Sequence, residues 1–351
     1  MSDVLRHDLS NWPTVSIVIV ALNCAENIGE CITRIKNQDY PLDSIEIHVI
    51  DGGSTDGTQK VASSMGATVI DGGYRDNSEP RRGIGLLKSQ NEIVAYIESD
   101  IFLPTNQWLK QMVRPLIEND GIVACQSLRY EYRRKDRLLN RYFALMGCHD
   151  PIAFYLRKRD KLTWYEKKWK LFGKAIDVDD FYKVTFNVSA LPPLGCNGFV
   201  ARRHELQTLT LPDVAELPRY THSDSVYDLV SQGQDTFAFV KNTVIHVPSN
   251  EPMWRYVARR MAYTKTLHFG QLERKYKVYD FHSLRDNVNL MKFSIYSITV
   301  IKPLFDSLRG FVNKPDRAWF VHPAICLMMF IGYSFITVRQ LAVKVFTRRT
   351  I

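Results

Sequence analysis

The sequence lacks the cysteine patterns of disulfide-rich and zinc-binding proteins. Its six cysteines are scattered, with no Cys-x-x-Cys pair and no spacing typical of metal ligands. We therefore expect neither a disulfide framework nor a structural zinc site, and the thiols indicate a reducing compartment. The chain also lacks repeats and low-complexity tracts. Its first 14 residues are polar and contain no apolar stretch, so we expect no signal peptide.

The overall composition is that of an ordinary globular protein. Of the 351 residues, 45% are hydrophobic and 24% are charged. These fractions exclude a disordered chain, a collagen and a coiled-coil rod. A chain of this length holds one large domain with appendages, or two domains.

Positive charge is concentrated in two segments, although the net charge of the whole chain is only +9. Residues 129–174 contain 14 Lys and Arg against 5 Asp and Glu, and residues 251–351 contain 17 against 6. The remainder is acidic, with 15 Lys and Arg against 26 Asp and Glu. This distribution argues against a general nucleic-acid coat and indicates local surfaces that meet an anionic partner. Phospholipid headgroups, a lipid-linked phosphate and RNA are the candidates.

Strand-like and helix-like segments alternate over residues 15–120. Short apolar runs predict four strands, at 15–21, 45–50, 67–71 and 92–97. A helix is predicted after the first strand by apolar or small residues at helical spacing, namely Ile28, Cys31, Ile32 and Ile35. This alternation predicts an α/β fold with an open parallel sheet and helices on both faces. Ligands of such sheets bind beyond the carboxyl ends of the strands, where Asp51 and Asp100 fall.

Two polar motifs occupy these strand ends. The turn DGGSTDGT begins at Asp51, and the acidic triplet Glu98-Ser99-Asp100 follows the fourth strand. Glycines let a backbone approach a ligand closely, and Ser, Thr and Asp supply hydrogen bonds. Each motif alone is usually just a turn or a solvated strand end. Their order along one sheet favours a functional interpretation.

In this order the motifs resemble those of glycosyltransferase family 2, whose members use nucleotide sugars and have the GT-A fold, a Rossmann-like, mostly parallel sheet. The resemblance covers residues 14–125 well and 190–262 loosely. It implies an inverting, metal-dependent transfer of a sugar, with UDP as the expected nucleotide. The QxxRW motif of processive polysaccharide synthases is absent. We therefore expect the addition of one sugar or a few, and no polymerisation.

The resemblance also implies roles for single residues. Asp51 resembles the acid that hydrogen-bonds the base of the nucleotide, and Glu98 would face the ribose, although the family has Asp there. The other nucleotide-binding candidates are Ala21, Asn23, Glu26, Gly53, Ser54 and Ser99. Asp100 resembles the acid that binds Mn²⁺ or Mg²⁺ against the charge of the leaving diphosphate. His246 ends an apolar run and is either a second metal ligand or a structural histidine.

The resemblance is weaker for the acceptor side. Of the family's acidic pair only Asp224 matches, and we expect it to take the proton of the acceptor hydroxyl. Asp228, one helical turn further on, is the rival candidate or an exposed helix residue. Asn197 lies in GCNG, which stands where the family has small residues.

A predicted helix after residue 250 contains three further candidates. Arg255, Arg259 and Arg260 are expected to contact the diphosphate or the acceptor, or else to face lipid headgroups.

Two apolar segments lie near the C-terminus. Residues 318–338 are 21 residues without a formal charge, and about 20 are enough to cross a bilayer. Residues 287–308 are interrupted by Lys292 and Lys302. The basic end belongs in the cytoplasm under the positive-inside rule. We therefore expect the two segments to cross as a hairpin or to lie in the interface as amphipathic helices. A buried core helix is the alternative.

We predict a catalytic domain over 1–250, with a basic and aromatic insertion near the acceptor side over 129–190. A basic helical arm follows over 251–286, and a membrane-attaching helix pair over 287–351. The expected acceptor is lipid-linked or an envelope glycan, at the cytoplasmic face of the cell membrane. Membrane lipid is an expected partner and nucleic acid is not.

Two other functions stay open at this stage. The first is a nucleotidyltransferase or a nucleotide-binding protein without transfer activity. The missing basic residue in ALNCAENIGE, after the first strand, counts against the nucleotidyltransferase. The second is an RNA-binding protein that uses the basic residues of 129–174.

Overall fold

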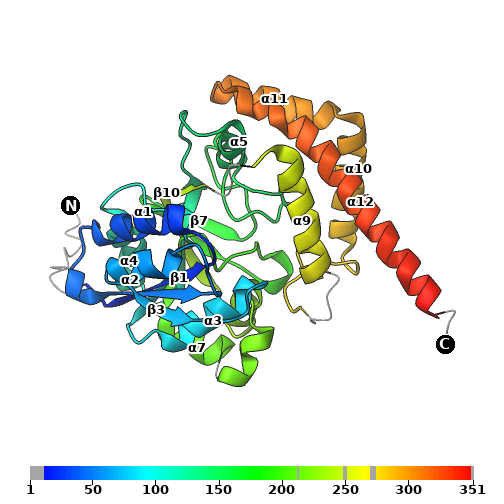
Figure 1. Ribbon diagram of the computed structural model, residues 1–351. Coiled ribbons are helices and arrows are strands. Elements are labelled where there is room, and N and C mark those ends of the chain that lie inside the picture. Colours follow the sequence, from blue (N-terminus) through cyan, green and yellow to red (C-terminus); the bar gives the residue numbers. More distant parts are fainter. Residues whose placement is uncertain (1–11, 212, 248–250, 269–273, 349–351) are drawn as a thin grey trace, which may run out of the picture. The chain divides into compact units, whose positions relative to one another are not determined.

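The computed structural model describes residues 12–348 except 212, 248–250 and 269–273 (Figure 1). The chain forms two compact units. The first comprises Met1–Leu128 and Gly173–His246, and the second comprises Arg129–Phe172 and Val247–Ile351. The chain therefore leaves the first unit after Leu128, returns to it at Gly173 and leaves it again after His246.

The first unit is built on a mixed β-sheet, which has ten strands among the described residues. These strands are β1 (Val15–Ala21), β2 (Ile45–Asp51), β3 (Thr68–Asp71), β4 (Ile93–Tyr96), β5 (Ile101–Phe102), β6 (Ala124–Tyr130), β7 (Lys174–Val178), β8 (Phe181–Thr185), β9 (Phe199–Arg202) and β10 (Thr236–His246). Their order is β3-β2-β1-β4-β9-β6-β10-β8-β7, and β5 pairs with β10 beside this path. β1 to β4 run parallel, whereas β9 pairs antiparallel with both β4 and β6. The pairs β10–β8, β8–β7 and β10–β5 are also antiparallel.

Helices cover both faces of this sheet. They are α1 (Ala25–Lys36), α2 (Thr58–Ser64), α3 (Ser78–Lys88), α4 (Trp108–Glu118), α7 (Arg203–Thr210) and α8 (His222–Ser231), with short 3₁₀ turns η1 (Leu42–Ser44), η2 (Val188–Ala190) and η3 (Val214–Arg219). Figure 1 shows α1, α2 and α4 on one side of the sheet and α3 and α7 on the other. β1 is consequently buried along its whole length. The predicted α/β fold is confirmed, and α1 buries the four residues predicted at helical spacing.

The strand order brings the two sequence motifs together. β1 lies between β2 and β4, with Ala21 beside Asp51 and Val18 beside Tyr96. All three strands run the same way, so DGGSTDGT and Glu98-Ser99-Asp100 leave the sheet at the same edge. Helix α3, which precedes β4, was not predicted from the sequence.

The second unit is mostly helical. It contains α5 (Leu138–Met146), α6 (Pro151–Tyr155), α9 (Met253–His268), α10 (Leu284–Thr299), α11 (Ile301–Asn313), the 3₁₀ turn η4 (Arg317–Phe320) and α12 (Val321–Arg348). Its core joins Tyr142 and Phe143 of α5 to Trp319 and Met329. A Cβ atom on Gly310 would lie 2.3 Å from the Trp319 ring, so glycine lets α11 pack directly on the indole. The stretch predicted as a helix pair thus forms three helices, α10, α11 and α12.

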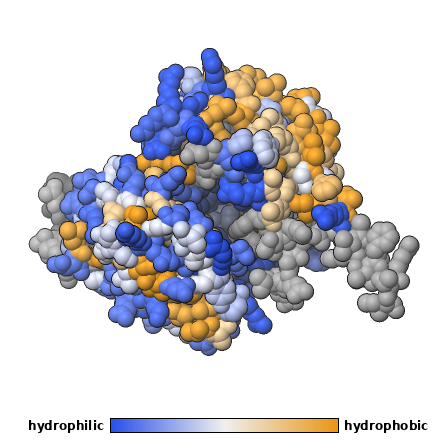
Figure 2. Space-filling model, viewed as in Figure 1, coloured by the Kyte–Doolittle hydropathy of each residue, from blue (hydrophilic) through white to orange (hydrophobic). Residues whose placement is uncertain are grey.

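The apolar run at 318–338 has two different parts. Trp319 and Met329 are fully buried in the core of the second unit, whereas Phe335 and Val338 are exposed. By length and composition Arg317–Arg339 could cross a membrane, and only 22% of its most apolar window is buried. In Figure 2 hydrophobic residues gather where Figure 1 draws α10, α11 and the first half of α12. The run is therefore not an ordinary core helix along its full length, and membrane attachment remains a prediction.

Candidate active site

Asp51 is held by the turn that it begins. Its Oδ2 accepts hydrogen bonds from the backbone N–H groups of Gly53 (2.9 Å) and Ser54 (2.8 Å). The same oxygen accepts one from Gln59 Nε2 (2.6 Å), and Oδ1 accepts one from the Ser54 hydroxyl. Burial would raise the pKa of Asp51, but these donors outweigh burial and lower it. Asp51 is therefore an ionised and rigidly oriented acceptor, and Gln59 is a partner that the sequence analysis missed.

The loop between β1 and α1 is joined to the same turn. The backbone N–H of Asn23 donates to Ser54 Oγ (2.8 Å), and Asn23 Oδ1 accepts from the N–H of Thr55 (2.9 Å). Asn23 has a left-handed backbone with φ of 49°, a conformation that Asn tolerates better than most residues. The structure thus brings Asn23, Ser54 and Asp51 together. Glu26 lies exposed in the first turn of α1.

Arg81 of α3 lies beneath this turn and was not predicted. Its Nη1 donates to the carbonyl of Ala21 (2.6 Å) at the end of β1. A Cβ atom on Gly52 would lie 1.9 Å from the same Nη1. A side chain at position 52 would therefore displace the buried Arg81 guanidinium from its contact with Ala21. The only sequence signal was Gly52 itself, which indicates a close approach without naming the partner.

Glu98 is bound on both carboxylate oxygens. Oε1 accepts from Arg82 Nη2 (2.9 Å), and Oε2 accepts from the backbone N–H of Asn197 (2.9 Å). Asn197 has φ of 54°, which turns its N–H toward the strand end. Two partners far apart in sequence thus fix the first acid of the triplet. Its role at the ribose remains a prediction.

Arg82 extends this contact into a buried chain of charges. It also lies 3.4 Å from Glu79, and Glu79 Oε2 lies 2.8 Å from His222 Nδ1 at the start of α8. Burial would raise the pKa of Glu79, but the charges of His222 and Arg82 hold it well below its usual range. Burial would lower the pKa of His222, but Cys196 and Glu79 raise it to about 10. The end of β4, α3 and α8 are therefore coupled electrostatically.

The GCNG loop packs against the start of α8. Gly195 has φ of 109°, and a Cβ atom there would lie 2.8 Å from the carbonyl oxygen of His222. Asn197, two residues on, donates to Glu98 as described. The loop thus connects α8 to the acidic triplet, and this close contact requires glycine.

Asp100 and His246 are the predicted metal ligands, and the structure brings them together. Asp100 Oδ2 lies 3.3 Å from His246 Nε2, and the Asp100 side chain is 32% exposed. Burial would raise the pKa of Asp100, but His246 lowers it. Two neighbouring ligands of an octahedral ion lie about 3 Å apart when each bond is about 2.1 Å. Among the described residues no group of three or more His, Cys, Asp or Glu is clustered tightly enough for a metal. Asp100 and His246 alone would supply two ligands, and metal binding by this pair remains a prediction.

Asp224 is buried in the first turn of α8. Its backbone N–H donates to Oγ1 of Thr221, the N-cap residue (3.3 Å). Asp224 is thus the third residue of the helix, where an acid also interacts favourably with the helix dipole. Asp228 lies one turn further along α8. Either acid stays a candidate for the general base.

The three predicted arginines belong to the second unit. On α9, Arg259 pairs with Glu251 (2.6 Å) and Arg260 with Asp150 (3.3 Å). Arg255 lies over the ring of Trp254. Two of the three are thus engaged by acids of their own unit, and their contact with a diphosphate or an acceptor remains a prediction.

Comparison with known sequences gives a family match that spans parts of both units. The family described as glycosyl transferase family 2 matches residues 16–189. These residues belong to glycosyltransferase family 2. The family 2 match takes in Asp51 and the acidic triplet and ends before Asn197, Asp224 and His246.

Curated relatives are similar over part of their length. Glycosyltransferase AglE of Haloferax volcanii is 32% identical over 151 residues, which cover 41% of this chain and 49% of the relative. Glucosyl-3-phosphoglycerate synthase of Mycolicibacterium paratuberculosis is 34% identical over 132 residues, which cover 34% of this chain and 38% of the relative. The chain thus spans about half or less of the length of these relatives.

Solved structures show a more distant likeness. A mannosyltransferase from Pyrobaculum calidifontis, in complex with GDP-Man and Mn²⁺, is 14% identical. Its TM-score is 0.49, with 92% of this chain and 87% of that chain covered. Glucosyl-3-phosphoglycerate synthase from Mycobacterium tuberculosis is 21% identical with a TM-score of 0.45. The likeness covers 74% of this chain and 81% of that chain. The family 2 assignment rests on the sequence match and not on these structures.

Proposed function

We propose that this chain transfers a sugar, with inversion, from a UDP-linked donor to a lipid-linked or envelope-glycan acceptor at the cytoplasmic face of the membrane. The observation that carries the proposal is the convergence of Asp51, Glu98 and Asp100. They leave one edge of the sheet on strands that flank β1, within a family 2 domain. Ligands of α/β sheets bind at such an edge.

The nucleotide would bind along the turn after β2. Asp51 would accept a hydrogen bond from an N–H of the base, and its own hydrogen bonds to the turn hold it ready for that contact. Arg81 stiffens the floor of the turn through its contact with Ala21. Glu98, fixed by Arg82 and Asn197, would orient the ribose.

Asp100 and His246 would hold Mn²⁺ or Mg²⁺ together with the diphosphate. A cation there offsets the negative charge that develops on the leaving group. Among the described residues, Asp100 and His246 form the carboxylate–imidazole pair at this end of the sheet with a spacing that fits such an ion.

Asp224 would act as the general base. It takes the proton of the acceptor hydroxyl while that oxygen attacks the anomeric carbon from the side opposite the diphosphate. The bond between the anomeric carbon and the diphosphate oxygen breaks, and the nucleotide diphosphate leaves with the electron pair. Attack from the opposite side inverts the configuration.

The membrane part of the proposal rests on the second unit. Large apolar side chains remain exposed on α10, α11 and α12, and 11 net positive charges lie in residues 251–351, with 17 Lys and Arg against 6 Asp and Glu. An anionic leaflet attracts such a surface, and attachment would concentrate the enzyme near a membrane-bound acceptor.

The test is release of nucleotide diphosphate from a panel of nucleotide sugars by the purified full chain. We expect one donor to be hydrolysed with Mn²⁺ and none with EDTA. Asp100→Ala should lower the rate by roughly 100-fold or more and leave thermal unfolding unchanged. Asp43→Ala, which removes an exposed acid of η1 before the start of β2, is the control and should keep full activity. Normal turnover by Asp100→Ala, or activity in EDTA, contradicts the proposal.

A further inference from the structure

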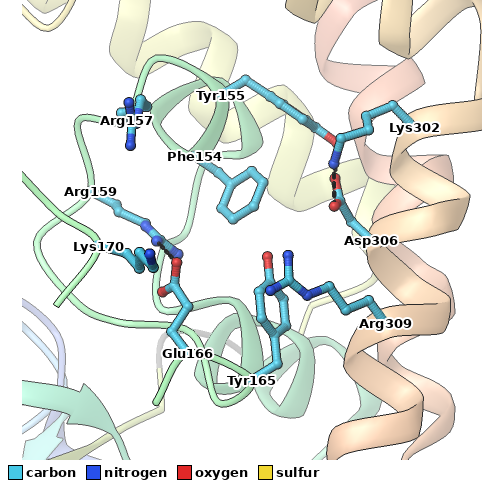
Figure 3. Close-up of a pocket in the computed structure, with 10 residues that line it drawn as sticks. All are labelled: Phe154, Tyr155, Arg157, Arg159, Tyr165, Glu166, Lys170, Lys302, Asp306 and Arg309. Atoms are coloured by element: carbon cyan, nitrogen blue, oxygen red, sulfur yellow. Dashed lines mark hydrogen bonds and ion pairs between the residues drawn. The ribbon is translucent and has the colours of Figure 1, made fainter. Parts of the chain in front are cut away.

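The second unit contains a strongly basic cavity that the proposed chemistry does not use. Its volume is about 390 Å³ (Figure 3). Five cationic side chains line it together with two acids, Glu166 and Asp306, and three aromatic rings. The cations are Arg157, Arg159, Lys170, Lys302 and Arg309. The first three come from the basic segment 129–174 and the other two from 251–351, so the two basic segments of the sequence meet in one cavity.

The two acids neutralise only part of this charge. Glu166 pairs with Arg159 Nη2 (2.5 Å), and Asp306 pairs with Lys302 and accepts from the Tyr155 hydroxyl (3.0 Å). Figure 3 shows the Arg159 side chain reaching toward Glu166. Arg159 is only 5% exposed, and its Nη1 has no hydrogen-bond partner among the described residues. The guanidinium also lies 4.9 Å from the centre of the Phe154 ring, so Glu166 and this ring hold Arg159 in the wall of the cavity.

The remaining three cations have no acidic partner within the described part of the chain. Arg157 and Lys170 are exposed, and Arg309 lies with its guanidinium 4.8 Å from the centre of the Tyr165 ring. Stacking on a ring leaves the N–H edge of an arginine available. Guanidinium edges and an ammonium group around one cavity match an anion with several oxygens, such as a phosphate or diphosphate group.

Helix α11 connects this cavity to an apolar surface. Lys302, Asp306 and Arg309 recur at helical spacing and line the cavity. Ser307 and Gly310 face Trp319 in the core. The outer side of α11 consists of large apolar residues that are 45–79% exposed, namely Ile301, Leu304, Phe305, Leu308 and Val312.

A helix with one apolar exposed side and cations along the next side is typical of the membrane interface. In such helices the apolar side reaches the acyl chains, and the cations lie at the depth of the phosphate groups. This arrangement favours a lipid phosphate over a free one, because the exposed apolar side chains would have no partner beside a soluble anion.

We propose that the cavity binds the phosphate group of a lipid whose chains contact the apolar side of α11. The proposal deepens the proposed function, on which it rests for the role of this lipid as acceptor. Binding itself needs no sugar donor. It can therefore be tested separately from sugar transfer.

The probe is a phosphatidylcholine vesicle with 20 mol% phosphatidic acid, and binding of the full chain is followed by co-sedimentation. The variant is Arg157→Asn with Lys170→Gln, which removes two exposed cations. Asn suits position 157 because φ there is 62°. The control is Lys167→Gln with Lys168→Gln, which removes two exposed cations of the same segment that do not line the cavity. Thermal unfolding checks that both proteins are folded, and Arg309→Gln is the second test variant.

We expect the cavity variant to need roughly tenfold more lipid for half-maximal binding, and the control less than about threefold more. Donor hydrolysis by the cavity variant should be unchanged, so loss of hydrolysis in the wild type would contradict the proposed function alone. Equal loss by variant and control indicates diffuse attraction and overturns the cavity site. If inorganic phosphate raises the unfolding temperature of the wild type but not of the cavity variant, while vesicle binding is equal, the ligand is a soluble anion and the lipid assignment is wrong.

Discussion

The guanidinium of Arg82 lies 2.9 Å from the carboxylate of Glu98, and the same guanidinium lies 3.4 Å from Glu79. Buried Arg82 thus pairs with Glu98 at the strand end and with Glu79 on its own helix. Because Glu79 also binds His222, the position of the acidic triplet is coupled to the start of α8.

Replacing Arg82 by Gln should destabilise the first unit by about 3–5 kcal/mol, because Glu98 would lose its cation and Glu79 would keep only His222. Urea unfolding measures the loss. Arg114→Gln is the matched control, since Arg114 pairs with Glu118 on the surface, where such pairs contribute about 0–1 kcal/mol. Equal effects of the two substitutions would show that the buried chain is not structural.

Gly52→Ala should destabilise the fold by about 1–3 kcal/mol, because the new methyl group meets the Arg81 guanidinium. In an Arg81→Ala background, Gly52→Ala should lower the free energy of unfolding by clearly less. Gly29→Ala is the control, since its nearest neighbour is 3.6 Å away and alanine favours a helix. If Gly52→Ala lowers the free energy of unfolding equally with Arg and with Ala at position 81, the methyl group does not act through Arg81.

Asp224→Asn keeps the size of the side chain but cannot take up a proton. We expect sugar transfer to fall by roughly 100-fold or more while donor binding is retained. The structural cost should be about 1 kcal/mol or less, from the weaker interaction with the helix dipole. Asp228→Asn, on the same helix, is the comparison. If only Asp228→Asn is inactive, the base is Asp228.

The Glu79–His222 pair predicts how stability depends on pH. The pKa of His222 is raised from 6.5 to about 10 in the folded chain. Protonated His222 therefore stabilises the fold fully below pH 6.5, and this contribution is lost as the pH rises toward 10. The pKa of Glu79 is lowered, so its contribution is lost only when the pH falls below the ordinary value of 4.5.

Unfolding midpoints measured between pH 6 and 10 test this dependence. The wild type should lose stability over this range, and His222→Gln should lose less. Cys196→Ala should move the decline to lower pH, because Cys196 helps to raise the pKa of His222. Identical pH profiles for the wild type and His222→Gln would refute the assignment.

Membrane attachment through α12 is tested without disturbing the core. Ile331, Phe335 and Val338 are 57–66% exposed, and burying each in lipid contributes about 1.5–3 kcal/mol. Replacing all three by Ser should move part of the chain from the membrane to the soluble fraction without lowering its unfolding temperature. Wild-type chain that is wholly soluble at ordinary salt without detergent would rule out attachment.

The sequence alone determined the elements whose causes are local. The β-branched run at Val15–Ala21 and the helical spacing from Ile28 to Ile35 encode a buried strand and an amphipathic helix, since both depend on neighbours within a few residues. The acids at the ends of β2 and β4 could be assigned to one edge because parallel strands share a direction.

Only the tertiary structure decided which distant groups share an environment. Arg81 and Arg82 lie in a segment without a recognisable motif, and they gain their roles from Gly52 and Glu98, which are neighbours only in the folded chain. The basic cavity likewise joins Arg159 to Arg309. Such contacts form only when distant segments pack together. They leave no periodic signal in the sequence, because the partners are far apart along the chain.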